Sequence, residues 1–580
     1  MKRFQLLSLI ISLVLLLSGC SRSEQEAAEG TELTTYEQTA YRVRSDFTAR
    51  LDADQGWAGP LNGNVTVNAD QPFRIRFEVE STTKESEERR FRLQYRRNGG
   101  AWMNVEVSDF PYPEEMAPRV SVDRVGAYQH GAQTTDLLAA SGAPFGGGSG
   151  INLSAVSPAW AGEAAHSEWE WPLVIRRFAD GPVTNEEGDT FEFRMADAGG
   201  APIRSDANPA VTLSIPEGHL GGTFVETPGR IGPWEASNGD LYFIMEPTET
   251  DNVLMVVKST DRGATWREVD GANRPAADDL EGFATDVRQG TIHMLHQQSD
   301  AVWYHSFRTS DHPADPDRWD IRDELVTEPG EPPTQVASLV VRSDGSIVGV
   351  YGGPAKIRFK IRSPDGTWGD ETVVDSDVPP NLSGPQVVLG ENDVVHLAYT
   401  GDDGTAWYRR IRQDGPLTPR EQIATGLGTT EYDVGSILPL VFIPETNTAV
   451  VIYRLATGRL WERRIVDHGP PGDPVRVSDR MVVQNAVDSD QTGADAIADG
   501  NTVHVLFIEE NSGSIFHTYS SEPGVWQPPT LEVDGIQGQW IRGTKLVQGE
   551  EGDVYGFVYD AGSNGGTGMN EYGEVPLNNR

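Results

Sequence analysis

The sequence predicts an all-β protein in which an N-terminal β-sandwich precedes a seven-bladed β-propeller. Two observations indicate this fold. A pattern of turn, apolar run, turn and apolar run returns every 47 to 55 residues between residues 217 and 580. Before it, residues 41–216 alternate apolar and polar side chains without that repeat. A repeat near 50 residues with several short strands is typical of propellers, whereas alternation with period two is typical of half-buried strands.

Each copy of the repeat begins at a glycine or asparagine that opens a turn. A four-stranded blade cannot bury both of its faces alone, so neighbouring blades must cover them and the ring must close. The segment Gly221–Val225 comes directly before the first copy, and we expect it to complete the last blade and cover its edge. Seven turn residues predict seven blades: Gly239, Gly290, Gly345, Asn392, Asn447, Gly500 and Gly552.

Residues 1–20 are expected to be a lipoprotein signal peptide. A positively charged start precedes the apolar run Leu6–Leu17, which is too short to span a bilayer of ~30 Å as a helix. Leu-Ser-Gly-Cys, ending at Cys20, resembles a bacterial lipobox; the resemblance implies cleavage before Cys20 and lipidation of its thiol. The residue after Cys20 is Ser21 and not the aspartate that holds such lipoproteins at the inner membrane, so the resemblance implies the outer membrane if the cell has one. Residues 21–40 lack an apolar cluster and are predicted to be a flexible tether, so the membrane is reached through the lipid anchor only.

The net charge and the cysteine content exclude a nucleic-acid partner and an internal disulfide. The formal net charge of −40 at pH 7 would repel the phosphates of nucleic acid, so no nucleic-acid partner is expected. Cys20 is the only cysteine, so no internal disulfide can form and stability must come from buried area. The sequence also lacks a Cys/His zinc cluster, a P-loop and a dinucleotide-binding fingerprint.

Residues 41–216 are predicted to form the sandwich from short alternating strands. Phe73–Val79 and Phe91–Tyr95 place apolar side chains on one face and mostly charged ones on the other. Asn98-Gly99 follows the second run, and this dipeptide between alternating runs is a strong hairpin signal. Aromatic residues at strand spacing are usually core residues. Stacking on sugar rings is the alternative for four tryptophans: Trp102, Trp160, Trp169 and Trp171.

The motif Ser259–Trp266 fits the Asp-box pattern Ser-x-Asp-x-Gly-x-Thr-Trp. Asp261 is expected to accept hydrogen bonds from its own turn, and Gly263 to adopt a positive φ. A shorter copy of the motif ends at Trp368. The motif therefore predicts a turn whose hydrogen bonds stabilise a hairpin of the propeller. It does not predict a chemical role for that hairpin.

Around this motif the sequence resembles the opening blade of sialidases. Arg-Ile-Gly-Pro, beginning at Arg230, stands where that family has an Arg-Ile-Pro motif, and Glu246 and the Asp-box follow. The resemblance implies that Arg230 is the first of three arginines that bind the substrate carboxylate, a role that suits the planar guanidinium. A sialidase-like hydrolase would also need a tyrosine nucleophile, a glutamate base and two further arginines. The candidates are Tyr559, Glu509, Arg454 and Arg542.

A propeller usually binds its ligand at one mouth of the central channel, where innermost strands begin or end. The run that contains His296 resembles the His-bearing blade of propeller polysaccharide lyases, which implies His296 as the base of a β-elimination. Glu246, Tyr399 and Tyr453 are candidates for substrate binding, although tyrosines at strand ends also close the ring by packing. The residues expected at the mouth are Arg230, Glu246, His296, Tyr351, Tyr399, Tyr453, Arg454, Glu509, Tyr559 and Asp560.

These residues predict a polysaccharide or glycoconjugate partner that is cleaved by hydrolysis or β-elimination. A surface scaffold that binds glycan or protein without catalysis is the alternative, because propellers serve both uses. An enzyme should place an arginine near a Tyr or His paired with a carboxylate, whereas a scaffold should have a flat or plugged mouth. No cofactor is expected apart from calcium, for which the acidic stretch Asp488–Asp495 is the candidate.

Overall fold

A computed structural model describes most of the chain as two compact units. The first unit takes in the described residues of Met1–Ser108, Val120–Ile175 and Glu186–Ser214, and the second those of Asp109–Arg119, Arg176–Asn185 and Ile215–Arg580. No helix among the described residues has the length and apolar character needed to cross a membrane. The described residues are 33–45, 49–82, 88–107, 119–123, 128–179, 184–222, 229–247, 253–270, 274–276, 282–298, 301–310, 318–327, 337–353, 356–378, 385–427, 438–483, 493–535, 540–547, 552–561 and 570–577.

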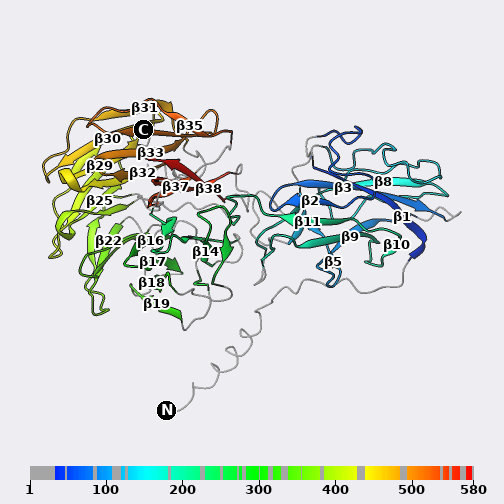
Figure 1. Cartoon of the computed structure of the whole chain (residues 1–580), viewed down its shortest axis with the longest axis horizontal. Helices are drawn as coiled ribbons and strands as arrows, with labels where there is room; N and C mark the ends of the chain where they lie inside the picture. The colour runs from blue at the N-terminus through cyan, green and yellow to red at the C-terminus, as the bar shows by residue number, and fades with distance from the viewer. Residues whose placement is uncertain are drawn as a thin grey trace, which may run out of the picture. The chain divides into compact units, whose positions relative to one another are not determined.

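The first unit is a β-sandwich of two sheets (Figure 1). One sheet has six strands, in the order β10 (Ile203–Ser205), β1 (Leu33–Arg44), β3 (Phe73–Ser81), β8 (His166–Ile175), β7 (Val120–Val122) and β6 (Glu106–Val107). The other has five, in the order β2 (Val65–Asn68), β11 (Ala210–Ser214), β9 (Thr190–Asp197), β4 (Phe91–Arg97) and β5 (Met103–Asn104).

Aromatic side chains build much of the sandwich core. Phe77 of β3 packs edge to face on Trp171 of β8 with ring centroids 5.9 Å apart, and neither ring is exposed. Trp160 and Trp169 are also buried, so core packing is confirmed for these three tryptophans. Trp102 differs from them, because two guanidinium groups lie over its ring at 4.8 and 4.1 Å from the centroid.

The predicted hairpin is present, but the sandwich starts earlier than predicted. Asn98 and Gly99 have φ values of 50° and 72°, and two positive values in succession fit the type I′ turn that joins β4 to β5. β1 begins at Leu33, inside the stretch 21–40 that was expected to be a tether, and pairs antiparallel with β3. The polar composition of this stretch conceals a strand whose buried residues include Tyr36.

The second unit contains seven antiparallel sheets, numbered here in chain order and coloured from green to red in Figure 1. Sheets 1 to 3 are β12 (Trp234–Glu235), β13 (Leu241–Met245), β14 (Met255–Ser259), β15 (Arg267–Glu268); β16 (Phe283–Arg288), β17 (Thr291–Gln298), β18 (Ala301–Arg308), β19 (Trp319–Leu325); and β20 (Ala337–Val341), β21 (Ile347–Gly353), β22 (Lys356–Arg362), β23 (Thr372–Asp375).

In sheets 4 to 7 the strands again lie side by side in chain order, and sheet 7 has three strands. They are β24 (Gln386–Leu389), β25 (Val395–Thr400), β26 (Ala406–Ile411), β27 (Glu421–Ala424); β28 (Leu440–Ile443), β29 (Thr448–Arg454), β30 (Arg459–Val466), β31 (Val475–Met481); β32 (Ala494–Asp499), β33 (Thr502–Ile508), β34 (Ile515–Ser520), β35 (Thr530–Val533); and β36 (Ile541–Val547), β37 (Asp553–Asp560), β38 (Asn570–Pro576). Short 3₁₀ turns, η2 (Glu391–Asp393) and η3 (Pro444–Thr446), precede β25 and β29.

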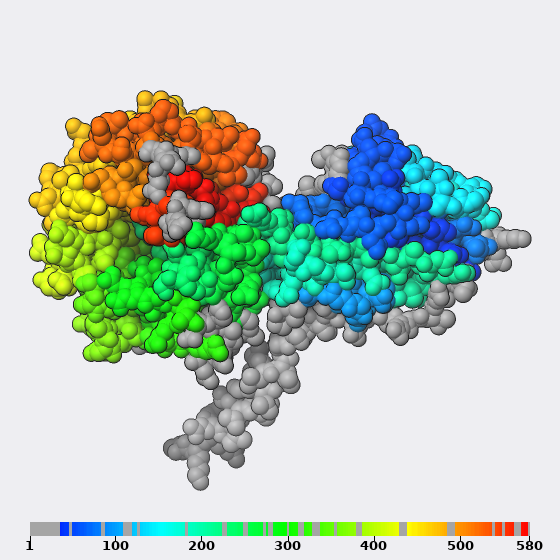
Figure 2. Space-filling model, in the orientation of Figure 1, coloured from blue at the N-terminus to red at the C-terminus, as the bar shows by residue number. Residues whose placement is uncertain are grey.

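Apolar side chains fill the space between consecutive sheets. Val350 and Phe359 of sheet 3, for example, pack in one core with Leu397 and Ile411 of sheet 4. The innermost strands of sheets 2 to 7 contact each other in sequence, and β36 of sheet 7 contacts β12 of sheet 1. Sheets 1 and 2 are joined by Trp234, whose Nε1 donates to Thr285 Oγ1 at 2.7 Å. Figure 2 shows the red C-terminal atoms against the green atoms of the early sheets. The sheets therefore form a closed ring, and the predicted propeller is confirmed.

The segment just before sheet 1 joins the two ends of the ring. Leu220 N donates to Asn570 O at 2.8 Å, so this segment lies along β38 as an additional outer strand of sheet 7. His219 and Glu571 form an antiparallel bridge, and His219 Nδ1 lies 2.8 Å from Glu571 Oε1. The closing strand thus begins earlier than the predicted Gly221–Val225, of which residues 223–225 lie outside the described part of the chain.

The turn Ser259–Trp266 connects β14 to β15 and is held by hydrogen bonds within itself. Asp261 accepts hydrogen bonds from Thr265 N at 2.8 Å and from Thr265 Oγ1 at 2.6 Å. Gly263 has a φ of +90°, and Trp266 Nε1 donates to Gly263 O at 3.0 Å. The hydrogen bonds expected within this turn are therefore present, and they hold the indole of Trp266 in a buried position.

Replacing Gly263 with alanine should weaken the ring closure. A Cβ at Gly263 would lie 2.1 Å from Tyr572 Cε1 of β38. Gly366, in the shorter copy of the motif, has a similar φ of +91° but faces only the flexible end of Arg362. We expect Gly366→Ala to lower the free energy of unfolding by about 1–2 kcal/mol, and Gly263→Ala by about 1–3 kcal/mol more because of the clash. Urea unfolding measures both, and equal losses would contradict this contact.

Candidate functional site

The ring brings the predicted mouth residues to one end. Each innermost strand runs antiparallel to the second strand of its sheet, so the start of one pairs with the end of the other. Phe283 pairs in this way with His296, and Ile541 with Tyr559. Arg230 lies at the same end, shortly before β12 begins. These positions therefore lie at the same end of their sheets, but most of their side chains turn into the cores between sheets.

The strand-end tyrosines are packing residues. Tyr399 OH donates to Asp375 Oδ2, in the preceding sheet, at 2.6 Å. Burial raises the pKa of Tyr559, and the nearby carboxylate of Glu571 raises it further. This geometry gives no support to Tyr559 as a nucleophile or to Tyr399 and Tyr453 as substrate ligands. Four different cores hold these side chains: Tyr351, Tyr399, Tyr453 and Tyr559.

Glu509 caps its own turn. Its Oε2 accepts hydrogen bonds from Ser512 N at 2.9 Å and Ser512 Oγ at 2.7 Å, and its Oε1 accepts one from Asn511 Nδ2 at 3.0 Å. Partial burial acts to raise the pKa of Glu509, but these hydrogen bonds outweigh it and lower the pKa below its usual range. Because Glu509 is engaged in its own turn, the structure gives no support to its predicted role as the base that pairs with Tyr559.

His296 is buried within sheet 2. Its Nδ1 lies 2.9 Å from His305 Nε2, and Asp323 N donates to His305 Nδ1 at 3.1 Å, so the proton between the two imidazoles belongs to His305. Burial lowers the pKa of His296 to about 4. With 1 % of its surface exposed, His296 gains no support as a base for a polysaccharide. The neighbouring His293 likewise bonds within the sheet, with Nδ1 2.7 Å from Tyr304 OH on the next strand.

Glu246 and Arg454 also lie inside the protein. Glu246 follows β13 and is 3 % exposed. Arg454, at the end of β29, is 8 % exposed and donates from Nε at 2.9 Å to the carbonyl oxygen of Val482, directly after β31. Neither side chain is presented to an opening, so the structure does not support their predicted contact with a substrate.

Arg230 is the predicted residue that spans the central channel. Its Nη2 donates to Leu440 O at 3.0 Å, and its carbonyl accepts from Thr285 N at 2.6 Å. Leu440 lies on the innermost strand of sheet 5 and Thr285 on that of sheet 2, so residue 230 crosses the middle of the ring. Its side chain is half-buried, and no ion pair joins it to a carboxylate in the described parts of the chain.

Arg542 lies beside this crossing segment. Its Nε donates to the carbonyl oxygen of Gly229 at 3.1 Å, directly before Arg230. Burial lowers the pKa of Arg542 to about 10, which keeps the guanidinium charged at neutral pH. Of the three predicted arginines, Arg230 therefore lies on the crossing segment and Arg542 beside it, whereas Arg454 bonds to Val482 O.

Two unpredicted aspartates stand near these arginines and tie consecutive sheets together. Asp286 of β16 accepts from Val341 N of sheet 3 at 2.9 Å, and Asp495 of β32 accepts from Gly543 N of sheet 7 at 2.7 Å. Burial raises the pKa of both carboxyls, that of Asp286 to about 6, although Arg230 acts to lower both. An aspartate between small or apolar neighbours within an innermost strand is the sequence signal that could have found them.

Asp495 also accepts a hydrogen bond from Tyr555 OH at 3.0 Å. A tyrosine paired with a carboxylate near two arginines is the arrangement that a sialidase-like site requires. Tyr555 is fully buried, however, and burial raises its pKa, so no substrate can reach its hydroxyl. Asp495 ends the stretch Asp488–Asp495 predicted to bind calcium, and its bonds tie it to sheet 7 instead. Residues 488–492 lie outside the described part of the chain.

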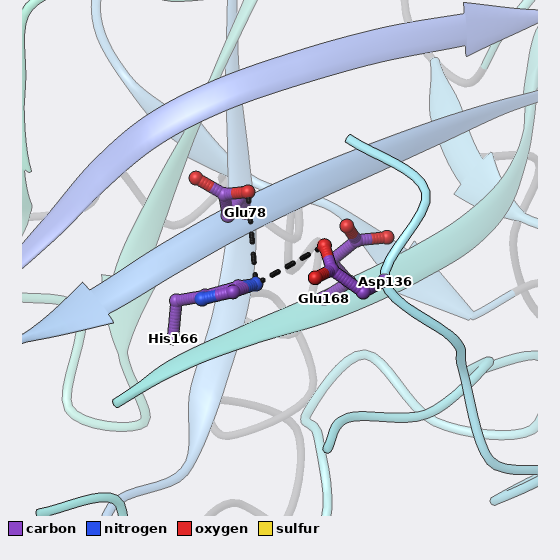
Figure 3. Close-up of side chains that lie close together, drawn as sticks. All are labelled: Glu78, Asp136, His166 and Glu168. Carbon is purple, nitrogen blue, oxygen red and sulfur yellow. Dashed lines mark hydrogen bonds and ion pairs between the residues drawn. The ribbon is translucent and has the colours of Figure 1, made fainter. Parts of the chain in front are cut away.

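A second group of titratable side chains lies in the sandwich (Figure 3). Glu78 comes from β3, His166 and Glu168 from β8, and Asp136 from a loop. Each offers one potential ligand atom, and these four atoms all lie within 4.8 Å of one another. Imidazole nitrogen and carboxylate oxygen are ligands for divalent metal ions, so this cluster is the place among the described residues where a metal could bind.

Comparisons with known proteins give structural likeness at low identity. No family model matches the chain, and no curated protein matches it. The chain is similar to the BP39L lectin from Burkholderia pseudomallei, with 11% identity over 61% of this chain and 97% of the lectin and a TM-score of 0.47. It is also similar to the Aleuria aurantia lectin in complex with Fucα1-6GlcNAc (15% identity, 55% and 98% coverage, TM-score 0.36) and to the NanB sialidase from Streptococcus pneumoniae (10%, 95% and 94%, 0.38).

Tyr399→Phe should destabilise the ring, whereas Tyr559→Phe should not. The first change removes the hydroxyl that donates to Asp375, and losing a hydrogen bond to a charged group costs about 1.5–3 kcal/mol. The hydroxyl of Tyr559 makes no hydrogen bond within the described residues, so we expect a loss of less than about 0.5 kcal/mol. Chemical unfolding measures the two free energies. A greater loss for Tyr559→Phe would contradict the packing role assigned to the pair.

Proposed function

We propose that this protein is a lipid-anchored envelope protein whose propeller binds a carboxylate-bearing glycan at the mouth of its central channel, without cleaving it. The observation that carries the proposal is the position of Arg230. Its guanidinium has several N–H donors and makes one hydrogen bond, to Leu440 O, within the described residues. A partly desolvated guanidinium with donors to spare is suited to a ligand carboxylate.

The electrostatics of the channel support an isolated carboxylate as the ligand group. Arg542 adds a second positive charge beside the segment that contains Arg230. The negative charges of Asp286 and Asp495 oppose these positive charges. Burial raises the pKa of Asp286 to about 6 and also raises that of Asp495, so the opposing charge decreases as the pH falls. The net charge of −40 disfavours long polyanions, so a chain with single acidic sugars fits the protein better than a uniformly charged polymer.

Resemblance supports a sugar as the bearer of that carboxylate. Arg230 occupies the place of the first carboxylate-binding arginine of sialidases, and the Asp-box follows at the expected place. Binding is favoured over cleavage because Tyr559 is packed in a core, Glu509 caps a turn and His296 is buried.

The N-terminal sequence supports the location. The apolar run Leu6–Leu17 and the lipobox-like residues before Cys20 are typical of bacterial lipoproteins. We infer that a lipid on Cys20 attaches the chain to the outer membrane, with the sandwich preceding the propeller along the chain.

Arg230→Gln should abolish selectivity for a carboxylate. Full-length protein in mild detergent would be titrated by calorimetry with oligosaccharides ending in a sialic or uronic acid, and with their methyl esters. We expect at least about tenfold tighter binding of the acids, about 1.4 kcal/mol, and loss of that preference in Arg230→Gln. Arg308→Gln is the matched control, because Arg308 has a side chain that is 65% exposed and pairs with Asp320 outside the channel.

Two outcomes of this experiment would contradict the proposal. If Arg230→Gln lowers stability but keeps the preference for the acids, Arg230 is a strut to Leu440 and not a ligand-binding residue. If the wild-type protein releases reducing ends or unsaturated uronates from the same oligosaccharides, the proposal that it binds the glycan without cleaving it is wrong.

Affinity for the acidic ligand should increase as the pH falls from 8 to 5.5. Burial raises the pKa of Asp286 to about 6, so its negative charge near Arg230 is lost over this interval while a sugar carboxylate stays ionised. Removing one nearby charge should change the affinity on the order of tenfold, about 1.4 kcal/mol. Asp286→Asn should bind at pH 8 about as tightly as the wild type at pH 5.5. An affinity that does not change with pH in the wild type would contradict this coupling.

A further inference from the structure

We propose that Glu78, Asp136, His166 and Glu168 bind one divalent metal ion of the zinc or manganese kind, which fastens the loop containing Asp136 to the sandwich sheet. The site is separate from the propeller and from the glycan-binding role proposed above. In Figure 3 the imidazole of His166 points toward Glu78 and Asp136, and Glu168 lies on the same strand as His166.

The hydrogen bonding of His166 determines what its Nε2 can do. Its Nδ1 lies 2.8 Å from Ala143 O, and a carbonyl only accepts, so Nδ1 carries a hydrogen. In the neutral imidazole Nε2 therefore presents a lone pair. That atom lies 3.2 Å from Asp136 Oδ1 and 3.9 Å from Glu78 Oε2, and ionised carboxylates cannot donate. The imidazole is 2 % exposed. A cation between these atoms would satisfy all three.

Hydrogen bonds from outside the cluster hold the glutamates in place. Glu168 Oε1 accepts from Leu137 N at 2.9 Å and from Leu138 N at 2.7 Å, next to Asp136 in the chain. Glu78 Oε2 accepts from Ala140 N at 2.9 Å. Carboxylates that bind metals are commonly oriented by such bonds. The loop that supplies Asp136 therefore also orients both glutamates, which is what a site assembled by loop closure requires.

The charge of this sheet face also leaves room for a divalent cation. Its fully buried arginines and glutamates balance one another: Arg44, Arg74 and Arg76 against Glu78, Glu168 and Glu170. Glu80 and Asp136 add two negative charges, and neither forms an ion pair with an arginine or lysine among the described residues. Uncompensated charge next to a buried face is costly. A divalent ion with a neutral His166 would cancel the surplus.

The ligand set favours a particular class of ion. Three carboxylate oxygens suit manganese, and zinc binds both imidazole nitrogen and carboxylate oxygen. Calcium prefers six to eight oxygen ligands, more than these four residues offer without many waters. Ligands drawn from β3, β8 and a loop would make such an ion a structural clamp of the sandwich.

The test uses the full-length protein, stripped with a chelator and then titrated with Zn²⁺, Mn²⁺ or Ca²⁺ alone. We expect one equivalent of Zn²⁺ or Mn²⁺ to bind and to raise the Tm, with weaker binding of Ca²⁺. Asp136→Asn, whose side chain is 39% exposed and should tolerate the change, and His166→Gln should each weaken binding by at least about tenfold. His130→Gln is the matched control, because His130 is an exposed histidine of the same unit.

Three results would overturn the proposal. In the first, neither Zn²⁺ nor Mn²⁺ binds, and the Tm instead rises on acidification in the wild type but not in His166→Gln. A proton on His166, and not a metal, would then balance the carboxylates. In the second, Asp136→Asn and His166→Gln both bind the metal as tightly as the wild type does. In the third, Ca²⁺ binds more tightly than Zn²⁺ and Mn²⁺.

Discussion

Closure of the ring is the constraint on which the second unit depends. Each sheet has two apolar faces that only its neighbours can cover, so the last sheet must meet the first. Leu220 pairs with Asn570, and the rings of Phe243 and Trp540 stack between sheets 1 and 7 with centroids 6.4 Å apart. The same closure places the backbone before sheet 1 across the centre of the ring. Arg230 reaches sheet 5 from there, and this reach is the basis of the proposed binding site.

The polar side chains at the inner end of the ring mostly serve this closure. Asp286 and Asp495 accept amide hydrogens from the next sheet, and Tyr399 donates to the preceding one. Buried polar groups must be paired or they destabilise the fold, so an end rich in Tyr and Asp is also an end rich in ties between sheets. A concentration of reactive residue types is therefore weak evidence for catalysis in a propeller.

The repeat, the hydrogen-bonded turn at Ser259–Trp266 and the Asn98-Gly99 hairpin could be predicted because each depends on local sequence. The direction of a side chain at a strand end could not be predicted, because the tilt of the neighbouring sheet decides whether Tyr559 points into the channel or into a core between sheets. β1 was missed at its start because its first residues are largely polar. The sandwich cluster was out of reach for another reason: a remote loop must fold over β3 and β8 before Asp136 meets His166.

The binding site in the ring is the central claim, and a structure of the full-length protein with a bound acidic monosaccharide tests it most directly. The account predicts the sugar carboxylate within hydrogen-bond distance of the guanidinium of Arg230, at the end of the channel where the innermost strands begin. A sugar bound at the sandwich, between the outer strands or at the opposite end of the ring would contradict it. So would an Arg230 whose guanidinium has no contact with the ligand.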